Sequence, residues 1–126
     1  MRTEFEWLLV ALGGSIGAIS RYGLTLASNR FLGSAFPFGT LLANLVGCFL
    51  AGLILGSGIA HKNDPIRMGV GIGFLGALTT FSTFGVETLT QFDKGHWGLA
   101  MGNVAANVIL GLGFVFLGML AGRRLA

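Results

Sequence analysis

Four long apolar stretches, separated by short polar connections, make up most of the chain. They lie at about residues 7–27, 39–59, 68–90 and 98–122. A helix needs about 20 mainly apolar residues to cross a bilayer, so each stretch is long enough to span one. The pattern predicts an all-α integral membrane protein, a single four-span domain over residues 1–126 with both termini on one side.

The composition agrees with a membrane protein and excludes other classes. Of the 126 residues, 53% are hydrophobic and only 10% are charged, whereas a soluble domain has about 25% charged residues. The formal net charge of +3 comes from scattered residues, and without a basic patch it does not indicate a nucleic-acid partner. Cys48 is the only cysteine, so no intramolecular disulfide forms, and we interpret it as a packing residue.

The third apolar stretch contains an unusual polar run at residues 79–84, where four hydroxyl side chains and two phenylalanines follow one another. A hydroxyl in lipid costs free energy unless it meets a partner. The glycines that precede the run weaken the helix there; they are Gly69, Gly71, Gly73 and Gly76. The sequence therefore predicts a broken third helix, and such a break is tolerated only inside protein or beside a polar cavity.

Polar residues also occur in the first two apolar stretches. Thr40 and Asn44 are one helical turn apart and share a face. The two N–H donors of Asn44 suit either a dehydrated anion or a hydrogen bond to another helix. Arg21 either extends to the lipid headgroups or supplies a fixed positive charge near an anion path.

The third stretch offers further candidates. Phe81 and Phe84 share a helical face, which suits packing or contact of a small anion with the positive ring edges. Ser82 and Thr83 add a polar set, and Thr83 can meet Glu87 one turn later. Glu87 is either an interfacial carboxylate or part of a polar path.

The fourth stretch contains two polar residues but no candidate chemistry. Asn103 and Asn107 are again four apart, and the sequence does not assign them a role. Across the chain, no nucleophile–base pair, metal-ligand cluster or phosphate loop is evident, so we do not expect an enzyme.

Basic residues give only a weak indication of orientation. Five lie on the side of the termini and three on the other; they are Arg2, Lys62, Arg67, Arg123 and Arg124 against Arg21, Arg30 and Lys94. Such a small difference fits a single orientation with cytoplasmic termini. It also fits insertion both ways, which makes an antiparallel homodimer possible.

Taken together, the segments resemble the Fluc (CrcB) family of fluoride channels. The similar pieces occur in the family's order and cover essentially the whole chain. They are residues 13–18, 21–22, 36–41 with Asn44 and Gly47, and 73–84 followed by Glu87. The piece over residues 73–84 is the most specific of them.

This resemblance implies a fluoride-selective channel of the bacterial inner membrane, built as an antiparallel, dual-topology homodimer with two pores. It implies that Asn44 lies on the ion path and that the ring edges of Phe81 and Phe84 line it. Arg21 would lie near the vestibule. A polar track would consist of Thr40, Ser82, Thr83 and Glu87. The backbone carbonyls of Gly76 and Thr79 would bind a structural sodium ion at the dimer interface.

Two other classes of membrane protein are compatible with four spans. A small multidrug transporter is also a dual-topology protein, but it relies on a carboxylate within its first span. Here the interior of the first span has no Asp or Glu and carries Arg21 instead. A non-transporting assembly factor would explain the glycines but not the line of polar groups.

Overall fold

The computed structural model describes residues 2–62 and 64–126 and is helical throughout its regular elements. In this described part, four segments are long and apolar enough to cross a membrane. The first two are single helices, α1 (Arg2–Leu32) and α2 (Phe38–Ser57). The predicted all-α architecture with four long apolar segments is therefore confirmed, and it is compatible with a membrane protein.

The third and fourth segments are each composed of several elements. The third consists of η1 (Arg67–Leu75), α5 (Gly76–Leu78) and α6 (Phe81–Asp93). The fourth consists of α7 (Trp97–Ala105), η2 (Ala106–Leu110) and α8 (Gly111–Leu125). The short α3 (Ile59–Lys62) and α4 (Asp64–Ile66) lie between α2 and the third segment, and Asn63 is outside the described residues.

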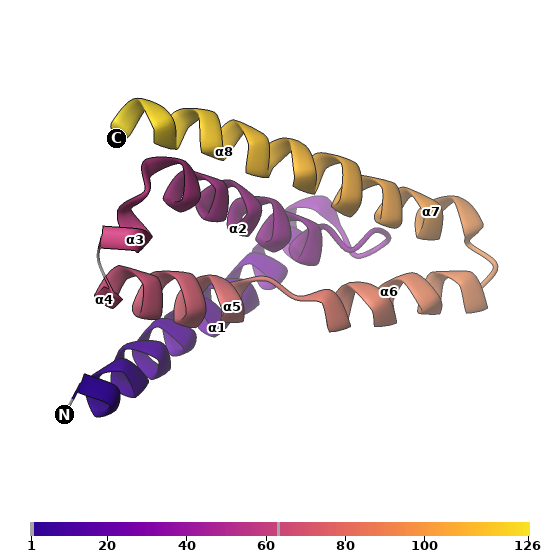
Figure 1. Cartoon of the computed structure of the whole chain (residues 1–126). Coiled ribbons are helices and arrows are strands. Elements are labelled where there is room, and N and C mark those ends of the chain that lie inside the picture. Colours follow the sequence, from indigo (N-terminus) through magenta and orange to yellow (C-terminus); the bar gives the residue numbers. More distant parts are fainter. Residues whose placement is uncertain (1, 63) are drawn as a thin grey trace.

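The second, third and fourth segments lie side by side, and α1 crosses them obliquely (Figure 1). Helix α2 lies between the fourth segment on one side and the third on the other, and α1 crosses beneath the third segment (Figure 1). Both termini lie at the same end of the molecule (Figure 1). This placement agrees with the even number of spans.

The first connection is shorter than the sequence indicated. It was expected to begin at Ser28, but α1 continues as far as Leu32. The Ser28 hydroxyl donates to the Leu24 carbonyl within the helix, so it does not compete with helix formation. The helix ends only at Gly33, whose φ of 82° is a left-handed conformation that glycine adopts readily.

Glycines allow α2 and α8 to approach closely. A Cβ on Gly118 would meet the backbone carbonyl of Phe49, and one on Gly52 would meet that of Val115. In lipid, where no hydrophobic force drives helices together, this close backbone contact is a main source of association.

Glycines also allow α1 to approach the third segment closely. Gly13 and Gly17 lie against the carbonyls of Gly69 and Phe74. Here the third segment is the π-helix η1, a wider winding that is rare and typically short. Of the glycines expected to weaken the third helix, Gly69, Gly71 and Gly73 lie in this π-helix and Gly76 begins α5.

The third helix is broken where the hydroxyl run begins. Thr79 (φ −82°, ψ 155°) and Thr80 (φ −153°, ψ 120°) are extended between α5 and α6. The Thr83 N–H donates to Thr80 Oγ1 over 3.1 Å, so Thr80 is the N-cap of α6. The predicted break is confirmed.

The contact between α2 and α8 yields a stability prediction. Gly118→Ala places a methyl group against the Phe49 carbonyl, and we expect a loss of roughly 1–3 kcal/mol because packed interfaces tolerate added volume poorly. Thermal unfolding of the detergent-solubilised protein measures it. Gly113→Ala is the matched control, because nothing lies within 4 Å of a Cβ there. Equal melting temperatures for both variants would contradict the packing argument.

Candidate functional site

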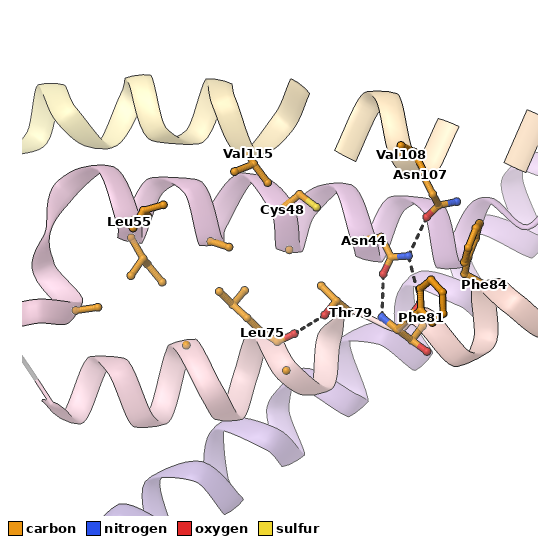
Figure 2. Close-up of a pocket in the computed structure, with 17 residues that line it drawn as sticks. Asn44, Cys48, Leu55, Leu75, Thr79, Phe81, Phe84, Asn107, Val108 and Val115 are labelled. Atoms are coloured by element: carbon orange, nitrogen blue, oxygen red, sulfur yellow. Dashed lines mark hydrogen bonds between the residues drawn. The ribbon is translucent and has the colours of Figure 1, made fainter. Parts of the chain in front are cut away.

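A cavity of about 800 Å³ lies beside the break, between α2, the third segment and the fourth. Its lining is mainly apolar, and four residues add polar side chains to it, namely Asn44, Thr79, Thr80 and Asn107. Figure 2 shows Asn44 reaching from α2 toward Asn107 on one side and toward the break on the other. Such a lining, apolar with a few converging polar groups, is typical of a binding site.

Asn44 satisfies the backbone of the broken helix. Its Oδ1 accepts from the Thr80 N–H over 2.9 Å, and its Nδ2 donates to the Thr80 carbonyl over 3.3 Å. Backbone groups that leave a helix at membrane depth need such partners, because lipid supplies none. The Asn44 side chain thus replaces the backbone partners that Thr80 would have in a continuous helix.

The Asn44 amide continues into a chain of hydrogen bonds that we call the amide relay. Asn44 Nδ2 donates to Asn107 Oδ1 (2.8 Å), and Asn107 Nδ2 donates to Asn103 Oδ1 (2.9 Å). Asn103 Nδ2 donates to Thr88 Oγ1 (2.9 Å), which donates to the Phe84 carbonyl (2.7 Å). The relay links α2, α7, η2 and α6.

Sequence reasoning did not assign this relay. The four-residue spacing of Asn103 and Asn107 indicated that they share a face, but it gave no partner on another helix. Asn103 is fully buried, so its amide needs the partners that the relay supplies. Thr80, the N-cap, was likewise absent from the expected site residues.

Two residues of the predicted polar track, Ser82 and Thr83, lie at the first turn of α6 beside Thr80. Thr80 Oγ1 donates to Thr83 Oγ1 over 3.0 Å and lies 3.3 Å from Ser82 Oγ. Ser82 and Thr83 are both exposed in the single chain. The structure therefore brings these two predicted residues together with the break.

The two predicted phenylalanines line the cavity next to Asn44 (Figure 2). Their ring centroids are 5.6 Å apart and the ring planes are tilted by 49°. The Phe81 side chain is 83% exposed in the single chain. Phe81 therefore contributes little to the internal packing of this chain, which was the alternative explanation of the pair.

Thr40 and Glu87 lie in a second, smaller cavity of about 270 Å³. Thr40 Oγ1 donates to Glu87 Oε1 over 2.7 Å, whereas the Thr83 hydroxyl is bonded at the N-cap. Within the described residues, the buried Glu87 Oε2 accepts no hydrogen bond. Because Thr40 is one turn before Asn44, the polar face of α2 passes from one cavity to the other.

Arg21 is separated from these groups. It lies half-buried on α1, and in the described part of the chain it is not among the residues that line either cavity. Its role near a vestibule stays a prediction.

The carbonyls of Gly76 and Thr79 lose their α-helical donors. The Gly76 carbonyl would pair with the Thr80 N–H, but that N–H donates to Asn44. The Thr79 carbonyl would pair with the Thr83 N–H, but that N–H donates to Thr80 Oγ1. Both residues line the large cavity, so their backbone oxygens fit a hard cation, which prefers oxygen ligands.

Comparison with known proteins identifies the family of this chain. The family described as CrcB-like protein, Camphor Resistance (CrcB), matches residues 8–119. The fluoride-specific ion channel FluC of Shewanella frigidimarina is 54% identical over 112 residues, which cover 88% of this chain and 90% of that protein. The protein of the same name from Dehalococcoides mccartyi is 45% identical over 122 residues, covering 95% and 94%.

These matches extend over most of the chain, and the family match over residues 8–119 spans the broken third segment. They also agree with the expectation that the protein is a multi-pass bacterial membrane protein and not an enzyme. The chain belongs to the CrcB family.

Proposed function

We propose that this protein is a fluoride-selective channel that lets fluoride leave the cell passively. The observation that carries the proposal is the break in the third span, where Asn44, Phe81, Phe84 and a group of hydroxyls lie together beside a cavity. Relatives that are about half identical are named fluoride-specific ion channels. Passive export suffices, because fluoride that enters as neutral HF dissociates in the cytoplasm and is trapped as the anion.

Selectivity would follow from replacing the water that fluoride holds tightly. Amide donors, hydroxyls and ring edges offer partial positive charge in a narrow path, and larger halides would be excluded by size. The bond from Asn44 Nδ2 to the Thr80 carbonyl is 3.3 Å long, against 2.8 Å to Asn107. The longer bond is the weaker one, so a passing anion would replace it first. Weak binding also allows the ion to leave.

The functional unit would be an antiparallel homodimer. A cavity of about 800 Å³ is far larger than one fluoride requires, and the exposed Phe81 ring has no cover in the single chain. A second copy placed against the break would narrow the cavity and cover the ring. The weak charge bias between the two sides permits insertion in both orientations.

A structural sodium ion at this interface would use the carbonyls of Gly76 and Thr79 from both copies. When bound, the ion would supply a positive charge that attracts the carbonyl oxygens of both copies and so stabilises the dimer. The support is the diversion of both helical donors described above.

The multidrug transporter is disfavoured. Such a transporter needs a carboxylate inside its first span, but within α1 the two acidic residues, Glu4 and Glu6, lie at the start of the helix. The family match also covers the chain from residue 8 to residue 119.

Liposomes containing the purified protein test the proposed activity. We expect rapid fluoride efflux, followed with a fluoride electrode once a counter-ion pathway is supplied, and no comparable chloride efflux from matched vesicles. Fluoride selectivity separates this function from a membrane assembly role. Equal permeation of both halides, or no fluoride efflux, would refute it, and proton-coupled uptake of a cationic dye would revive the multidrug alternative.

Replacing either ring tests the phenylalanines. We expect Phe81→Ile or Phe84→Ile to slow fluoride efflux at least about tenfold, because an aliphatic group lacks the positive edge of a ring. Size-exclusion chromatography should give an unchanged dimer. Phe31→Ile is the control, since this exposed ring on α1 is not among the described residues lining the cavity. If both variants show wild-type fluoride efflux, the two rings serve only in packing and do not contact the ion.

Cysteine labelling tests the orientation. In a Cys48→Ala background, we expect about half of Ser34→Cys chains to react with a membrane-impermeant maleimide applied to intact cells. Ala126→Cys, at the other side of the membrane, should also react in about half of the chains. If one position labels fully and the other does not label, the protein has a single orientation.

A further inference from the structure

The amide relay has a fixed direction of donation. The Thr88 hydroxyl uses its single hydrogen on the Phe84 carbonyl, so it can only accept from Asn103. Asn103 must therefore present Nδ2 to Thr88 and Oδ1 to Asn107. By the same logic Asn107 presents Oδ1 to Asn44.

Burial makes this direction hard to reverse. Asn103 is 0% exposed and Thr88 is 5% exposed, so water does not replace a lost partner there. Turning over one amide would bring two donors face to face within the relay and leave a buried N–H without an acceptor, which is costly in a low-dielectric interior. Asn107 is also held by the backbone carbonyl of Asn103 over 3.0 Å.

At the end opposite Thr88, the relay holds the Asn44 amide against the break. Because Asn44 presents Nδ2 to Asn107, its Oδ1 faces the Thr80 N–H and accepts from it. That N–H is the donor that an unbroken α-helix would give to Gly76. With the Asn44 amide turned over, Thr80 would meet a donor instead, and its N–H would be free to return to the Gly76 carbonyl.

We infer that Asn107 is a positioning residue, which acts through Asn44 to keep the Gly76 carbonyl available to a cation. The inference rests on the proposed function, because it takes the cation to be the sodium ion proposed above. It goes further by assigning a role to the fourth span. It also makes Asn44 a shared element of the anion path and the cation site, so the two sites depend on one amide.

Asn107→Leu removes the acceptor for Asn44 with little change in volume. The protein is purified in detergent with N-methyl-D-glucamine as the only cation, and its melting temperature is followed as sodium chloride is added. N-methyl-D-glucamine chloride at equal ionic strength is the blank. We expect the half-saturating sodium concentration to rise roughly tenfold in Asn107→Leu, the scale of one lost hydrogen bond.

Asn107→Thr should rescue much of the response. A threonine hydroxyl in a helix can donate to the carbonyl four residues earlier and still accept a bond, as Thr88 does here. Ser15→Ala is the matched control, because it removes a side-chain hydrogen bond on an exposed face of α1. Its half-saturating sodium concentration should equal that of the wild type.

Thr88→Val provides an independent variant if Asn107→Leu does not fold. It removes the far anchor of the relay, and we expect a shift of the sodium midpoint in the same direction, by a few-fold. A merely structural role would lower the melting temperature without sodium but leave the midpoint unchanged. That result, in whichever of these variants fold, would overturn the inference.

The sodium titration needs no ion flux, so the two proposals can fail separately. A wild-type protein that conducts fluoride but gains no stability from sodium would overturn this inference and leave the channel function intact. A protein that conducts no fluoride would refute the function, while the titration would still decide the role of Asn107.

Discussion

The pairing of the Asn44 side chain with the Thr80 backbone is the interaction on which the rest of the site depends. A helix that breaks inside a membrane exposes donors and acceptors that lipid cannot satisfy. Here one amide accepts from the Thr80 N–H and donates to its carbonyl. Without this partner, the extended conformation at Thr79 and Thr80 would leave polar groups unpaired at membrane depth.

Close helix packing brings the two halves of this interaction together. Gly47 lies one turn after Asn44, and a Cβ there would overlap the Thr79 side chain. The absence of that Cβ lets the break approach α2 closely enough for the amide to reach it. The buried core at this level consists of Ala43, Leu75 and Leu78, so apolar packing and polar pairing fix the same contact.

Sequence patterns predicted the helices and the break because both depend on local composition. Apolar length gives a span, and glycines before a hydroxyl run weaken a helix. The end of α1 was misjudged, because polar Ser28 continued the helix and only Gly33 ended it. The relay was not predicted because its partners on different helices are far apart in the chain: Asn44 and Thr80 are separated by 36 positions, and Asn44 and Asn107 by 63. Spacing shows which residues share a face but not which faces meet.

The strengths of the hydrogen bonds separate groups that hold the fold from groups that can meet an ion. Buried Asn103 and Thr88 make short hydrogen bonds and are not among the residues that line the large cavity. Breaking these bonds would therefore cost much free energy. The contacts of 3.3 Å, from Asn44 to the Thr80 carbonyl and between Thr80 and Ser82, lie at the break itself. A path for an ion needs both short and long hydrogen bonds. The short ones hold the donors in accurate positions, and the long ones are easily replaced by contacts to the ion. In this chain the Asn44 amide makes one bond of each kind. Its Nδ2 donates a short bond to Asn107 in the fourth span and a long bond to the Thr80 carbonyl in the third.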